Sequence, residues 1–142
     1  MTLPLGKWSL LVTILALLGC TTQPLVDPLE AKARDGDPVA ACQLVARSLH
    51  SCALEKQKWE NGQLSIRPAC VDNGITKLQM AYLDKADTGL EGQQFNRIFF
   101  GVTKVELATA ALLLQAGPAD KAMEAIDELP QSCANLADRP KI

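Results

Sequence analysis

Apolar residues recur at intervals of three and four along most of the chain, which is the period of an α-helix rather than of a β-strand. The first long stretch of this kind begins at Pro38 and includes Val45 and Leu49. It predicts a helix over 38–58, which ends at the polar run ENGQ (60–63).

The same spacing predicts three further long helices, at 69–87, 93–116 and 118–129. A break inside the first of them stays open, because the run DNG (72–74) places a helix-weakening glycine there. Pro130 is expected to stop the last helix, since proline lacks the backbone donor that a helix interior needs.

A short helix is expected ahead of these, with Asp27 as its N-cap, Pro28 as its first residue and Gly36 as its stop. Asp37 and Pro38 then repeat the same start signal for the helix at 38–58. Alternation of apolar and polar residues, which is typical of strands, never lasts beyond a few positions. The pattern therefore predicts an all-α protein, a small bundle of antiparallel helical hairpins with about four main helices joined by short turns.

The stretch 93–116 has the widest apolar surface of the predicted helices. Its main stripe consists of Phe95, Ile98, Phe99, Val102, Val105, Leu112, Leu113 and Ala116. Because 105–116 is apolar nearly all round, we expect this helix to be central and mostly buried.

The cysteines add a constraint on how the helices pair. Cys42, Cys52, Cys70 and Cys133 are an even set, which in an oxidising compartment indicates two disulfides. Cys42 and Cys52 would lie about 15 Å apart on one helix, whereas a disulfide needs Cα atoms within about 7 Å. Two connectivities remain, and a hairpin turning near residue 61 favours Cys52–Cys70 together with Cys42–Cys133.

The first 19 residues have a different character from the rest. Lys7 gives a weakly basic start, and the apolar stretch 10–18 is shorter than the ~20 residues that a membrane span needs. This is the pattern of a secretory signal. Its ending, LLGC at 17–20, resembles the lipobox of bacterial lipoproteins. The resemblance implies cleavage before Cys20 and attachment of acyl chains to that cysteine.

By this resemblance the chain divides into a signal peptide (1–19), a lipidated tether (20–27) and a single helical domain (28–142). The lipid bilayer would then be a partner through acylated Cys20. Thr21 follows the cysteine where enteric lipoproteins retained at the inner membrane carry aspartate, so the resemblance implies an outer-membrane anchor that faces the periplasm.

Two turns of the chain also resemble each other. GDPVAACQLV from Gly36 and GPADKAMEAI from Gly117 each place an alanine five residues after the glycine and a branched residue four further on. This is similar to the turn and second helix of tetratricopeptide-type hairpins. The two copies are 81 residues apart, which is not a multiple of the roughly 34-residue repeat, so ordinary helical hairpins are the alternative.

Composition and motifs argue against several classes of function. The net charge of −2 comes without a basic patch, so nucleic acid is not an expected partner. His50 is the only histidine and no C-x-x-C pair occurs, so we expect no metal site and no cofactor. Catalytic residues are also not expected, because a cysteine–histidine pair would need a free thiolate and no G-x-S-x-G elbow is present.

Two stretches are candidate protein contacts. Trp59 lies near the tip of the first hairpin, and exposed tryptophan is enriched in binding hot spots, although it could instead fold back on the loop 64–70. Ile98, Phe99 and Phe100 are consecutive and cannot all face one core, so Phe99 or Phe100 could face a partner. Burial between helices is the alternative.

These observations lead to a functional hypothesis. The chain is expected to be a membrane-anchored, periplasm-facing lipoprotein that acts as a non-enzymatic interaction or assembly factor for an envelope protein. The alternative is a periplasmic inhibitor or immunity-type protein that binds an effector enzyme. Small lipidated helical proteins with an internal disulfide resemble secretin pilotins, but in architecture only.

Overall fold

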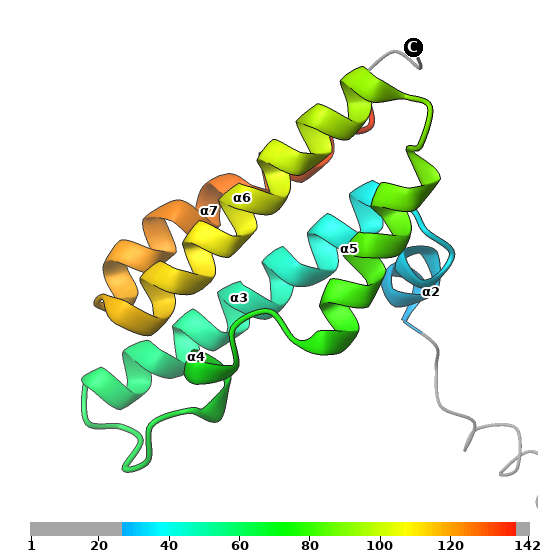
Figure 1. The fold of residues 1–142 in the computed structure, drawn as a ribbon. Helices are drawn as coiled ribbons and strands as arrows, with labels where there is room; N and C mark the ends of the chain where they lie inside the picture. Colours follow the sequence, from blue (N-terminus) through cyan, green and yellow to red (C-terminus); the bar gives the residue numbers. More distant parts are fainter. Residues whose placement is uncertain (1–26, 139–142) are drawn as a thin grey trace, which may run out of the picture.

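The computed structural model describes residues 27–138, and all regular structure in this part of the chain is helical. The predicted signal peptide, Cys20 and nearly all of the tether lie outside the described residues. The helices, drawn in Figure 1, are α2 (Pro28–Arg34), α3 (Pro38–Glu60), α4 (Ala69–Asn73), α5 (Lys77–Gly89), α6 (Gln94–Ala116) and α7 (Ala119–Asn135). Four are long and two are short, which confirms an all-α fold with four main helices.

Helix α3 is the centre of the bundle. It contacts every other helix, with α6 and α7 along one side and α2 and α5 along another (Figure 1). Side chains from all the long helices meet in one core, and the largest that are fully buried are Val45, Leu83, Phe100, Leu107, Leu114, Ile126 and Leu129. The prediction that 93–116 is the central helix is therefore wrong.

The helix starts follow the predicted capping chemistry. The Asp27 carboxylate accepts a hydrogen bond from the Leu29 amide at 3.0 Å, and Asp37 does the same for Val39 at 3.1 Å. In each case the acidic side chain pairs with an amide that has no partner within the helix, and proline follows as the first helical residue.

The predicted helix at 69–87 is broken into α4 and α5. Gly74 ends α4 with a φ of 56°, a left-handed conformation that side chains with a Cβ rarely adopt. Thr76 and Gln79 then form a reciprocal capping box that starts α5. The open alternative of a break near 72–74 is the one that the structure adopts.

Pro130 does not stop the last helix, and this prediction is wrong. Helix α7 continues through Pro130 to Asn135. Pro130 is exposed, whereas Leu129 and Cys133 on either side of it are buried. Burial of these side chains, together with a disulfide from Cys133, offsets the hydrogen bond that proline cannot make.

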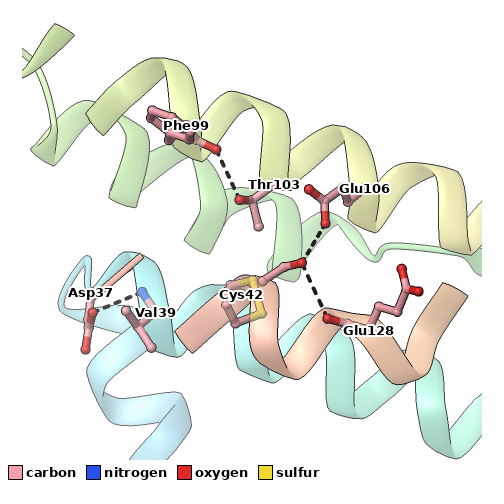
Figure 2. Close-up of a disulfide and its surroundings, with 9 residues drawn as sticks. Asp37, Val39, Cys42, Phe99, Thr103, Glu106 and Glu128 are labelled. Atoms are coloured by element: carbon pink, nitrogen blue, oxygen red, sulfur yellow. Dashed lines mark hydrogen bonds between the residues drawn. A yellow bond between two sulfur atoms is a disulfide. The ribbon is translucent and has the colours of Figure 1, made fainter. Parts of the chain in front are cut away.

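Two disulfides connect the helices in the pairing that helix geometry favours. Cys42 on α3 is bonded to Cys133 on α7, with Cα atoms 5.5 Å apart (Figure 2). Cys52 on α3 is bonded to Cys70 on α4, with Cα atoms 5.9 Å apart. The first ties the end of the chain to the central helix, and the second closes the loop at the tip.

A polar clamp holds the turn between α6 and α7 against α3. The buried Lys56 ammonium donates to the Leu114 carbonyl at 2.6 Å and also to the Gly117 carbonyl. One turn later, the Glu60 carboxylate accepts from the Ala119 amide at 2.8 Å. A cation thus meets the carboxyl end of α6 and an anion meets the amino end of α7, which is the favourable arrangement for both helix dipoles.

Candidate functional site: the outer face of α6

Helix α6 turns the predicted stripe away from the core. The side chains that it packs against the bundle, here called its inner face, are Asn96, Phe100, Thr103, Leu107, Ala110 and Leu114. The residues that we predicted to be buried lie largely on the opposite side. The expectation of a mostly buried helix is wrong because the buried residues of α6 lie along this one face.

The exposed side of α6 forms a regular apolar seam. We define its outer face as Phe95, Ile98, Val102, Val105, Thr109, Leu112 and Ala116, all of them exposed. The intervals between successive members alternate between three and four residues throughout. The exposed fractions include 59% for Ile98, 64% for Val105 and 63% for Leu112. Such a spacing is the heptad pattern of a helix that pairs with another helix.

One edge of the outer face borders α7 and is acidic. Val102, Val105 and Thr109 of α6 line a shallow groove of about 270 Å³ together with Ala125 and Glu128 of α7 and with Glu106. The Ser132 hydroxyl donates to the Glu106 carboxylate at 2.7 Å and lies 3.4 Å from the Glu128 carbonyl oxygen (Figure 2). This hydroxyl holds Glu106 beside α7, and no lysine or arginine lines the groove.

The other edge of α6 is fixed by ion pairs to α5. Asp87 accepts hydrogen bonds from Arg97 at 3.0 and 3.3 Å, and its other oxygen lies 3.6 Å from Lys104. The hydrogen bonds from Arg97 hold the pKa of the Asp87 carboxyl below its usual range, with Lys104 assisting and partial burial opposing. These cations are therefore engaged within the bundle.

The two phenylalanines predicted as candidate contacts have different positions. Phe100 is fully buried on the inner face, so it is a core residue and not a contact. Phe99 is half-buried, and its ring packs edge-to-face against Phe95 with centroids 4.6 Å apart. Phe99 thus borders the outer face through Phe95.

Trp59 is half-buried at the tip of the α3 hairpin. The Arg67 guanidinium lies 5.4 Å from the centre of its ring, and Arg67 also bonds Asp72 at 3.1 Å and the Gln115 carbonyl at 3.3 Å. The loop 61–68 therefore folds back over Trp59, which is the alternative that the sequence left open. Ile66 on the same loop remains 80% exposed. Arg67 thus contacts both Trp59 and the carboxyl end of α6, whereas Trp59 does not line the groove beside the outer face.

His50 is exposed on α3 and borders a second groove, of about 460 Å³, between α2, α3 and α7. Leu29, Arg47 and Ile126 also line it, and Arg47 is paired with the Asp27 carboxylate. Within residues 27–138, no group of three or more histidine, cysteine, aspartate or glutamate side chains is arranged to hold a metal ion.

Comparison with known protein families, curated proteins and solved structures finds no match for this chain. By length and composition, α6 is the one helix in the described part of the chain that could cross a bilayer. Core helices of soluble proteins meet the same criterion, and α6 packs along α3 and α7.

The sequence pattern does not predict the outer face, because an apolar stripe ordinarily indicates burial. The strict alternation of three and four from Phe95 to Ala116 was present in the sequence, and it was the available signal for a helix-pairing face. Small or neutral residues such as Gly101 and Ala108 lie between the two faces. They make the two stripes look like one continuous apolar surface in the sequence.

Proposed function

We propose that this protein is a lipid-anchored factor of the bacterial envelope that acts by binding another protein. The observation that carries the proposal is the outer face of α6. It exposes an ordered row of large apolar side chains, and such surfaces on soluble domains are typical of interaction sites.

The proposed anchor rests on the lipobox-like residues 17–20, which precede the helical domain by only a few residues. Two or more acyl chains on Cys20 would hold the domain at a membrane surface, since each buried methylene contributes about 0.8 kcal/mol. The polar stretch up to Asp27 would let α6 face a partner instead of the lipid. The two disulfides are consistent with an oxidising compartment.

The test has two readouts from the same cells. Incorporation of labelled palmitate is compared between the native chain and Cys20→Ala, and loss of label in the variant is the expected result. Proteins that co-purify from detergent-solubilised envelopes are then compared among the native chain, Cys20→Ala and Val105→Asp. A matched control, Ile66→Asp, adds the same charge at another exposed apolar site, on the tip loop.

An envelope protein retained by the native chain and by Ile66→Asp, but lost with Val105→Asp, supports binding through α6. If it is also lost with Cys20→Ala, the lipid is required to place the domain. If it survives without the lipid, the helical domain binds alone, and an inhibitor or adaptor role gains support. Palmitate labelling that persists in Cys20→Ala would contradict the anchor.

A further inference from the structure

We infer that the outer face of α6 binds a helix of the partner protein that has an apolar heptad seam and a basic edge. This inference rests on the proposed function and names the chemistry of the partner. It is carried by two observations: the spacing of the outer face and the charge of the groove beside it.

The spacing of the outer face indicates that it binds a helix. Seven exposed positions follow the alternation of three and four without interruption across three heptads, from Phe95 to Ala116. A partner helix that supplies its own residues at this spacing can insert them between those of α6 along its whole length. Thr109 is the single hydroxyl in the row, and it already donates to the Val105 carbonyl at 2.8 Å.

The negative charge of the groove indicates that the partner helix carries basic residues along one edge. Glu106 and Glu128 stand on its two sides, and α7 as a whole carries four carboxylates and one lysine. A helix laid along α6 would place its flanking residues over this groove. Lysine or arginine at those positions would pair with the two glutamates, whereas acidic residues would be repelled.

A second copy of this chain does not supply that edge. Two antiparallel α6 helices would bring Glu106 toward its own counterpart. In two parallel α6 helices, Glu106 of one copy would face the residues on the other flank of the outer face in the second copy. These residues are uncharged: Gln94, Gly101, Ala108 and Gln115. The two cations of α6 itself, Arg97 and Lys104, are engaged by Asp87.

A bilayer surface fits less well than a basic helix. Helices that lie on membranes carry lysine or arginine along the polar face, where these residues meet anionic headgroups. The edge of the outer face toward α7 carries carboxylates instead.

The experiment measures binding of three fluorescent synthetic peptides by anisotropy. All three are helices of about three heptads with the same leucine and isoleucine seam, and they carry lysine, glutamine or glutamate at the flanking positions. The full chain is held in phosphatidylcholine nanodiscs, or is used free in buffer if Cys20 carries no lipid. The result therefore does not depend on the proposed anchor.

We expect the lysine peptide to bind at least about tenfold more tightly than the glutamate peptide. The double variant Glu106→Gln/Glu128→Gln should abolish this preference, and the matched control Asp35→Asn/Asp84→Asn, which removes two exposed carboxylates elsewhere, should keep it. Val105→Asp/Leu112→Asp should abolish binding of all three peptides. Its thermal unfolding, measured in parallel, should remain that of the native chain because both positions are exposed.

Equal binding of the three peptides, or binding of none, would overturn the inference. A stable dimer in sedimentation that Val105→Asp dissociates would assign the outer face to a second copy. Flotation of the chain with anionic vesicles that requires Val105 and Leu112, but not Cys20, would assign it to the membrane surface. Either result would leave the proposed anchor to be judged by palmitate labelling.

Discussion

The two faces of α6 share one spacing, but the exposed face is the more apolar of the two. The inner face buries two polar side chains, Asn96 and Thr103, beside Phe100 and Leu107. The outer face exposes phenylalanine, isoleucine, valine and leucine. A helix on the surface of a monomeric protein ordinarily buries its most apolar stripe. Contacts at the ends and edges of α6 account for this orientation, and the partner helix that we propose would account for the apolar outer face.

Those contacts are polar and specific. Lys56 binds the carbonyls at the carboxyl end of α6, and Asp87 binds Arg97 and Lys104 on one edge. Rotating α6 to bury the outer face would break the ion pairs that Asp87 makes with Arg97 and Lys104.

The largest contrast between the two faces should be in stability. Leu107 is fully buried on the inner face and Leu112 is exposed on the outer face of the same helix. We expect Leu107→Ala to lower the free energy of unfolding by about 2–5 kcal/mol through lost burial and a cavity. Leu112→Ala should change it by no more than about 0.5 kcal/mol. Urea unfolding of both variants, followed by circular dichroism, measures the difference.

Similar losses in both variants would show that the outer face is covered in solution, and the assignment of the two faces would fail. Repeating the measurement over a hundredfold range of protein concentration separates the explanations. A concentration-dependent loss for Leu112→Ala would indicate self-association.

The helices themselves were predictable because their signals are local. The capping aspartates Asp27 and Asp37, each followed by proline, mark two helix starts, and period 3.6 marks the rest. The disulfide pairing was also predictable: the helix axis excludes a bond between Cys42 and Cys52, and a hairpin turning near residue 61 favours Cys52–Cys70 over the other remaining pairing. In each case neighbouring residues or simple geometry decide the outcome.

Local signals did not predict which face of α6 is buried or how far α7 extends. Which apolar stripe is buried depends on contacts between helices, which are made by Lys56 of α3 and Asp87 of α5. Continuation of α7 through Pro130 depends on the bond from Cys133 to Cys42, 91 residues away. A local rule for proline does not include such contacts. The lipid anchor at Cys20 stays a prediction, since that residue lies outside the part of the chain that the structure describes.

A second prediction concerns the clamp that orients α6. Lys56→Met keeps the length and most of the volume of the side chain but removes the ammonium that binds two carbonyls. Because buried carbonyls would lose a charged donor, we expect a loss of about 2–3 kcal/mol in the free energy of unfolding. The exposed Lys58→Met, two residues along α3, is the matched control and should change stability by less than about 0.5 kcal/mol.

The Lys56→Met variant also tests whether the clamp sets the orientation of α6. If the clamp orients α6, loosening it should increase amide hydrogen exchange at the carboxyl end of α6 and the start of α7. Exchange in α2 and α5 should remain as in the native chain. A uniform increase across all helices would instead assign to Lys56 a general contribution to stability, without a role in orienting α6.

The smallest expected effect on the free energy of unfolding comes from the ion pairs between α5 and the edge of α6. Asp87→Asn removes the anion that pairs with Arg97 and Lys104, and we expect a loss of about 0.5–1 kcal/mol at pH 7, since the partners are partly exposed. Asp84→Asn, on the same helix and exposed, is the control and should have no measurable effect.

The stability lost in Asp87→Asn should depend on pH. The pKa of Asp87 is held below its usual range in the folded protein, mainly by Arg97, so folding favours the charged carboxylate. Its contribution is complete above the unfolded pKa of about 4 and is lost as the pH falls through the lowered folded pKa. The native chain and Asp87→Asn should therefore differ at pH 7 and converge in acid. A difference that stays constant from pH 7 into acid would show that packing of the side chain, and not the ion pair, holds this edge of α6 to α5.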